Sequence, residues 1–152
     1  MKKAVSFLIC TVLLFSFAMA EQRVVLPGSR YAIDIPDGMK YSPAEEVDEG
    51  IEAYISDTLE MDYFSYPMTE GMLTLQQRAE AQAAKGSDVE MRTVNGIEML
   101  VYRVTDEADG APCIGYAFMD GTQIVEVFFW YATQEAADLT RSIMETIRVN
   151  NS

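Results

Sequence analysis

A chain of 152 residues with 49% hydrophobic and 23% charged residues has the composition of a globular protein, which argues against a disordered, collagen-like or coiled-coil chain. Its 24 acidic and 11 basic side chains give a net charge of −13, which argues against nucleic acid and anionic membranes as partners because both require basic patches. There is no histidine, and the two cysteines are Cys10 and Cys113. Ser-His-Asp catalysis, Cys-His catalysis and histidine-ligated zinc are therefore excluded.

Residues 1–20 have the pattern of a secretory signal peptide. Lys2 and Lys3 precede an apolar run, and Ala18-Met19-Ala20 forms a small-x-small cleavage site. The run is shorter than the ~20 apolar residues that span a bilayer, so we expect cleavage after Ala20 rather than a retained anchor. The mature chain, residues 21–152, is then expected to be a single secreted or periplasmic domain, monomeric and without a membrane span or an intrachain disulfide.

The mature chain begins with strand patterns. Residues 30–35 alternate between polar and apolar side chains, and Pro36-Asp37-Gly38 ends them with turn chemistry. Residues 24–26 can form a short leader strand. Residues 51–56 and 61–66 are rich in aromatic and β-branched side chains, which predicts a hairpin.

After these strand patterns the spacing of apolar residues becomes that of a helix. Met72, Leu75, Ala79 and Ala83 recur at helical spacing, and Lys85-Gly86 supplies a basic last turn with a glycine after it. We expect a helix of roughly three turns.

Two hairpins are expected after this helix. Asn95-Gly96 and Asp120-Gly121 are strong signals for two-residue hairpin turns, because both of their positions tolerate positive φ. The strands expected on either side of them are residues 89–93 with 97–104, and residues 113–119 with 122–131.

The last of these strands is apolar on both faces. Residues 124–131 are apolar at both parities apart from Glu126, whereas a strand with one solvated face alternates. We therefore expect a central strand covered on both sides. The second cover is expected to be a final helix with Thr133 as N-cap, Ile147 on its apolar stripe and Arg148 near its C-terminal end, followed by a frayed tail.

Hairpins indicate an antiparallel sheet, and helices that do not alternate strictly with strands indicate an α+β fold. The predicted architecture is an antiparallel β-sheet of about six to seven strands flanked by two main helices.

This order of elements resembles the PsbP-like superfamily of secreted or lumenal proteins. The resemblance covers most of residues 30–148 and rests on the strand and Pro-x-Gly turn of residues 31–39, the hairpin at 94–97, the strand at 121–131 and the closing helix around 143–147. It implies an α/β/α sandwich with an antiparallel sheet between helices. It implies little about function, because such proteins include photosystem accessory proteins, binding factors and many uncharacterised exported bacterial proteins.

The acidic side chains suggest two kinds of site. A glycosidase or aspartic protease needs two carboxyls with separated pKa values, and no motif marks such a pair here. Calcium takes several oxygen ligands, and Asp106, Glu107 and Asp109 are the candidates in one acidic loop. A second acidic loop is expected at residues 43–50. The first loop lacks EF-hand spacing and the second lacks an internal glycine turn, so the alternative is solvated charge that keeps the protein soluble.

Cys113 has no histidine to activate it, so we interpret it as a buried, inert thiol, with an interchain disulfide as the alternative. Aromatic residues fall on most expected strands. Tyr63 has the opposite parity from Phe64 and Tyr66, so the two faces of the sheet are expected to carry different aromatic side chains.

These features favour an exported, non-enzymatic binding or accessory module without a cofactor. One sheet face or the acidic loops would contact a protein, a peptide or a small ligand. The alternatives are a carboxylate-dependent extracytoplasmic hydrolase and a calcium-binding stability module. The sequence identifies no catalytic residue, and the residues that would bind a ligand stay unknown at this stage.

Overall fold

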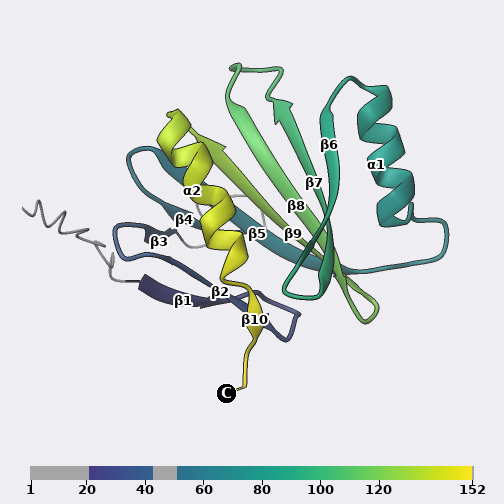
Figure 1. The fold of residues 1–152 in the computed structure, drawn as a ribbon, viewed down its shortest axis with the longest axis horizontal. Coiled ribbons are helices and arrows are strands. Elements are labelled where there is room, and N and C mark those ends of the chain that lie inside the picture. Colours follow the sequence, from purple (N-terminus) through teal and green to yellow (C-terminus); the bar gives the residue numbers. More distant parts are fainter. Residues whose placement is uncertain (1–20, 43–50, 152) are drawn as a thin grey trace, which may run out of the picture.

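Two antiparallel sheets and two helices make up the fold (Figure 1). The computed structural model describes residues 21–42 and 51–151. The predicted signal peptide and the acidic loop at 43–50 lie outside these residues. Within the described part of the chain, no helix is long and apolar enough to cross a membrane.

The larger sheet has seven strands in the order β3-β4-β5-β9-β8-β7-β6. All its neighbouring strands are antiparallel, and the three predicted hairpins form the pairs β4–β5, β6–β7 and β8–β9. The prediction of an antiparallel sheet of six to seven strands is confirmed. The strands are β3 (Lys40–Ser42), β4 (Glu52–Ile55), β5 (Leu59–Pro67), β6 (Asp88–Val94), β7 (Ile97–Thr105), β8 (Pro112–Asp120) and β9 (Gln123–Tyr131).

The smaller sheet contains β1 (Glu21–Val25), β2 (Tyr31–Pro36) and β10 (Arg148–Val149), with β2 in the middle. The sequence predicted that Ile147 and Arg148 belong to the last helix, and this was wrong. Helix α2 (Gln134–Glu145) ends before both residues, and Arg148 pairs with Ala32 across the smaller sheet. The side chain of Thr146, the C-cap, accepts a hydrogen bond from the backbone N–H of Asp34 at 2.7 Å, which holds the chain against β2 as it leaves the helix.

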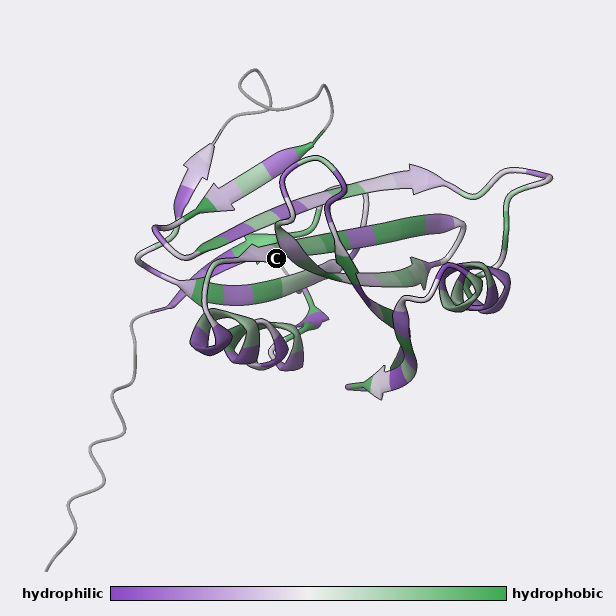
Figure 2. Ribbon diagram, turned by 90° about the horizontal axis from the view of Figure 1, so that it is seen from above, coloured by the Kyte–Doolittle hydropathy of each residue, from purple (hydrophilic) through white to green (hydrophobic). Residues whose placement is uncertain are grey.

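The two helices cover opposite faces of the larger sheet. Helix α1 (Leu75–Ala84) begins after the N-cap Thr74, so Met72 precedes it rather than opening it. Successive residues of a strand point to opposite faces. Leu100 packs in the cluster that contains Ala79 of α1, whereas Val101 packs in the larger cluster that contains Ile143 of α2. The fold is therefore an α+β sandwich, and Figure 2 shows the twist of its strands and the alternation of hydrophilic and hydrophobic residues along them.

Strand β9 is central and buried on both faces, as its sequence predicts. Val125, Val127 and Phe129 belong to the larger core cluster on the α2 face. On the α1 face Ile124 is buried, and Glu126 is only 8% exposed. Tyr63 is buried on the α2 face, while Phe64 and Tyr66 stack on each other on the opposite face, so the two faces do differ in their aromatic side chains.

Candidate functional site

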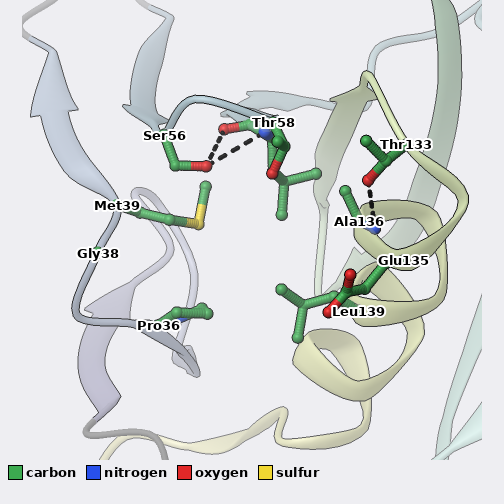
Figure 3. Close-up of a pocket in the computed structure, with 10 residues that line it drawn as sticks. Pro36, Gly38, Met39, Ser56, Thr58, Thr133, Glu135, Ala136 and Leu139 are labelled. Atoms are coloured by element: carbon green, nitrogen blue, oxygen red, sulfur yellow. Dashed lines mark hydrogen bonds between the residues drawn. The ribbon is translucent and has the colours of Figure 1, made fainter.

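A pocket of about 360 Å³ lies beside the N-terminus of α2. It is bounded by the β2–β3 turn, the β4–β5 turn and the first turns of α2 (Figure 3). Met39, Leu59 and Ala136 line it and are almost fully buried, and the half-buried Leu139 faces Met39 across it. The pocket is therefore mainly apolar.

Local sequence explains how Met39 comes to line this pocket. Pro36 fixes the entry to the turn, and the Met39 N–H donates to the Pro36 carbonyl at 3.0 Å, which closes it. The exposed Gly38 fills little space, so the turn leaves the cavity open beside the methionine side chain.

Two hydroxyl groups at the edge of the pocket form hydrogen bonds with the backbone of residues that line it. The Ser56 hydroxyl donates to the Leu59 carbonyl at 3.1 Å and accepts from the Leu59 N–H at 3.2 Å. The Thr133 hydroxyl caps α2 by accepting from the Ala136 N–H at 3.1 Å. Of the described residues that line the pocket, Glu135 is the one ionisable side chain. The arrangement can hold an apolar group next to a single carboxylate.

A second feature is a pair of carboxyls on the opposite face of the sheet. Glu60 and Asp62 flank Met61 on β5. The Trp130 indole donates to Asp62 Oδ2 at 3.0 Å, and Asp62 Oδ1 is buried with no hydrogen-bond partner in the described ranges 21–42 and 51–151. Burial, followed by the neighbouring Asp62 charge, raises the pKa of Glu60, and burial raises the pKa of Asp62 despite the hydrogen bond from Trp130.

The calcium candidates are not brought to one point. Asp106 and Asp109 line a hollow of about 260 Å³ with Glu60 and Trp130, while Glu107 lines a different hollow. Asp106 accepts a hydrogen bond from the Ala108 N–H at 2.6 Å, and Asp109 accepts one from the Ala111 N–H at 2.8 Å. These carboxylates shape their own loop. In the described part of the chain, no group of three or more Asp, Glu, His or Cys side chains is placed to hold a metal ion.

Cys113 is 1% exposed and has no disulfide partner among the residues that the structure describes. Burial raises the pKa of its thiol to about 12, so little reactive thiolate exists at neutral pH. This agrees with its interpretation as a buried, inert thiol.

The sequence predicted two local motifs that border the pocket, but it did not predict that they lie together at one cavity. It identified the turn at residues 36–38 and the cap at Thr133 as local motifs, and it gave Met39, Ser56 and Glu135 no role in a site. Their proximity depends on how α2 and β2 pack in the core, and no short-range pattern encodes that packing.

Comparison with known proteins establishes the fold. No protein-family model and no curated protein matches the chain significantly. The solution structure of cyanobacterial PsbP from Synechocystis sp. PCC 6803 is similar, with a TM-score of 0.59, 12% sequence identity, and coverage of 87% of this chain and 94% of that one. A crystal structure from Bacteroides thetaiotaomicron VPI-5482 has a TM-score of 0.56 and 12% identity, and the match covers 86% of this chain but 48% of that longer one. The fold is PsbP-like, and at this identity the likeness concerns the fold alone.

Proposed function

We propose that the protein is an exported, non-enzymatic binding or accessory module that takes up a small, mainly apolar ligand group in the pocket beside α2. The pocket of about 360 Å³ is the observation that carries this proposal, because concave sites with an apolar lining and few polar groups are the usual form of small-ligand sites. The pattern of residues 1–20 supports export.

The chemistry of the lining favours binding over catalysis. General acid–base or nucleophilic catalysis needs a nucleophile and a base within hydrogen-bond reach of each other. The Ser56 hydroxyl is engaged by the backbone of Leu59, and Glu135 is the one ionisable side chain among the described lining residues. The pocket therefore offers contacts and orientation to a ligand rather than a route for a proton.

A carboxylate-dependent hydrolase is the second candidate function, because Glu60 and Asp62 are adjacent and both have raised pKa values. The geometry favours it less. Glu60 lines the hollow next to Trp130, but Asp62 does not. One Asp62 oxygen accepts from Trp130 and the other is buried, so the pair does not present two carboxyls to one substrate. A glycan and peptide hydrolysis screen, repeated with Asp62→Asn, tests this candidate.

The binding proposal is tested by site-specific photo-crosslinking in the native host. A benzophenone amino acid replaces Glu135 at the mouth of the pocket, and the matched control replaces Glu98, which is exposed on the opposite face of the sheet. We expect a discrete adduct from position 135, and we expect Leu139→Trp, which fills the pocket, to remove it. An adduct that survives Leu139→Trp in a folded variant, or an equal adduct from position 98, contradicts the proposal.

A further inference from the structure

Three of the chain's seven arginines meet at one hollow on the other flank of α2. Arg92, Arg103 and Arg141 line a cavity of about 320 Å³, called here the arginine pocket. The protein has a net charge of −13 and only 11 basic side chains, so three arginines at one cavity are a specific feature of this surface. The arginine pocket is separate from the pocket in Figure 3 and shares none of its lining residues.

The strand register explains why these side chains converge. Arg92 on β6 lies opposite Met99 on β7, and Arg103 on β7 lies opposite Ile114 on β8. Met99 and Ile114 belong to the core cluster on the α2 face, so both arginines project from that face. Helix α2 lies over the same face and supplies Arg141.

Tyr116 also lines the arginine pocket. It pairs with Val101 across β7 and β8 and is 3% exposed. Burial raises the pKa of Tyr116, and a hydrogen bond with Thr140 and the charges of the three arginines act in the opposite direction. The positive charges therefore act together on the Tyr116 hydroxyl. Beside it, Val101, Ile114 and Ala137 give the cavity an apolar lining.

Each arginine already has an acidic neighbour, but the neighbours are exposed. Arg92 pairs with Glu90 at 3.1 Å, Arg103 with Asp88 at 2.9 Å and Arg141 with Glu145 at 2.9 Å. The three carboxylate side chains are 47%, 71% and 54% exposed, and exposed pairs contribute little to stability. Because a guanidinium has five N–H donors, these pairs position the arginines and leave donors for another anion. Asp138 is the one acid among the described residues that line the pocket, and its carboxylate accepts a hydrogen bond from the Gln134 side-chain amide at 2.9 Å.

We propose that the arginine pocket binds a small organic anion. The three guanidinium groups and the Tyr116 hydroxyl would hold its carboxylate or phosphate, and Val101, Ile114 and Ala137 would contact its apolar body. Guanidinium groups bind both kinds of oxyanion through paired hydrogen bonds. A free anion fits better than a phospholipid headgroup in a bilayer, because a net charge of −13 repels an anionic membrane surface.

The experiment is an NMR titration of the full mature chain with benzoate and phenyl phosphate, with benzamide as the neutral analogue. We expect saturable shifts of the backbone amides of Val101, Tyr116 and Ala137 with at least one anion, and none with benzamide. Arg141 is exposed on α2, so Arg141→Gln tests the site with little risk to folding. It is expected to raise the Kd about tenfold or more, the usual effect of losing a charged hydrogen bond.

Arg23→Gln is the matched control, since it removes the same charge from β1, outside the arginine pocket, and is expected to leave the Kd unchanged. The proposal is overturned if no anion gives saturable shifts, if benzamide gives the same shifts, or if Arg23→Gln weakens binding as much as Arg141→Gln. A last arm measures sedimentation with phosphatidylglycerol vesicles. Vesicle binding that requires Arg141, without binding of the free anions, would assign the pocket to a lipid headgroup and also overturn it.

Discussion

Arg148 and Asp34 form a bidentate ion pair that fastens β10 to β2. Arg148 Nη1 lies 2.6 Å from Asp34 Oδ2, and Nη2 lies 2.7 Å from Oδ1. The same Nη1 donates to the Thr146 carbonyl at 2.9 Å. The guanidinium therefore joins the end of α2 to the smaller sheet, at the point where the chain changes from helix to strand.

This pair predicts a pH-dependent contribution to stability. The hydrogen bonds from Arg148 hold the pKa of Asp34 below its usual value. Unfolded Asp titrates at about pH 4, so the pair stabilises the fold above that pH and the contribution is lost as the pH falls through the lower, folded pKa. Asp34→Asn should reduce the free energy of unfolding at neutral pH, and the difference from wild type should shrink in acid. Urea unfolding across this pH range measures it.

Asp37→Asn is the control for this series, because Asp37 is exposed in the neighbouring turn. It should leave the pH dependence as it is in the wild type. Curves for Asp34→Asn that run parallel to the wild type at every pH would show that Asp34 does not carry the dependence.

Position 115 has no room for a side chain larger than that of glycine, because the Tyr102 ring lies against it. The two residues face each other across β7 and β8, and a Cβ at position 115 would lie 2.6 Å from Tyr102 Cζ. Gly115→Ala should destabilise the protein by about 1–3 kcal/mol, the usual cost of overpacking a core. In a Tyr102→Ala background the same change should cost almost nothing. Denaturant unfolding of the four proteins gives this coupling, and an equal cost in both backgrounds would contradict it.

Local signals in the sequence determined the elements that the structure confirms. Asn95-Gly96 forms the predicted two-residue turn, with positive φ at both residues. The other hairpin forms as predicted, but its turn is Gly121-Thr122, one residue later than expected, because Asp120 ends β8 and pairs with Gln123. Thr133 caps α2 as predicted, because its side chain needs only a backbone N–H three residues away. Strand β9 could be recognised as central because burial on both faces removes the alternation of polar residues.

The features that the sequence did not reveal depend on distant contacts. Arg148 and Asp34 are far apart in the chain, so nothing near Arg148 signals that the helix must end before it. Arg92, Arg103 and Arg141 come from two strands and a helix, and each alone resembles a solvated charge. Such sites become visible only when register and helix placement are known.

Cys113 should react very slowly in the folded protein. It is 1% exposed and the pKa of its thiol is about 12, so both access and thiolate content are low. Alkylation of Cys113 by iodoacetamide should be roughly a thousandfold or more slower in the folded protein than in denaturant, where an ordinary thiol pKa of about 8.5 applies. Mass spectrometry gives both rates. Comparable rates, or a disulfide-linked dimer on non-reducing electrophoresis, would show that the thiol is accessible.

The Glu60–Asp62 pair should destabilise the fold at neutral pH. Both pKa values are raised in the folded state, so the folded protein favours the protonated forms. The contribution of the protonated carboxyls to the free energy of unfolding is fully present below the pKa values of the unfolded chain. It is lost as the pH rises through the higher pKa values of the folded protein. Asp62→Asn should therefore raise the free energy of unfolding at neutral pH while keeping an acceptor for Trp130. Glu60→Gln is the matched variant. A neutral-pH loss of stability in both would contradict this account.

One partly buried ion pair joins helix α1 to the central strand β9. Arg78 Nη1 lies 2.7 Å from Glu126 Oε1 on β9 and also donates to the Tyr66 hydroxyl at 2.7 Å. The Glu126 side chain is only 10% exposed, whereas Ala79 is the one fully buried residue of α1. Arg78→Met should leave the carboxylate buried without a cation and destabilise the protein by about 3–5 kcal/mol.

Burial raises the pKa of Glu126 even with Arg78 present, so this loss should be smaller in acid, where the carboxyl is protonated. Arg78→Met/Glu126→Leu should recover most of the stability, because removing both charges also removes the desolvation penalty. Hydrogen exchange locates the effect: amides of residues 75–84 should lose protection in Arg78→Met before those of β7 and β8. If the double variant is no more stable than Arg78→Met, or if protection falls equally across the sheet, the pair does not anchor α1.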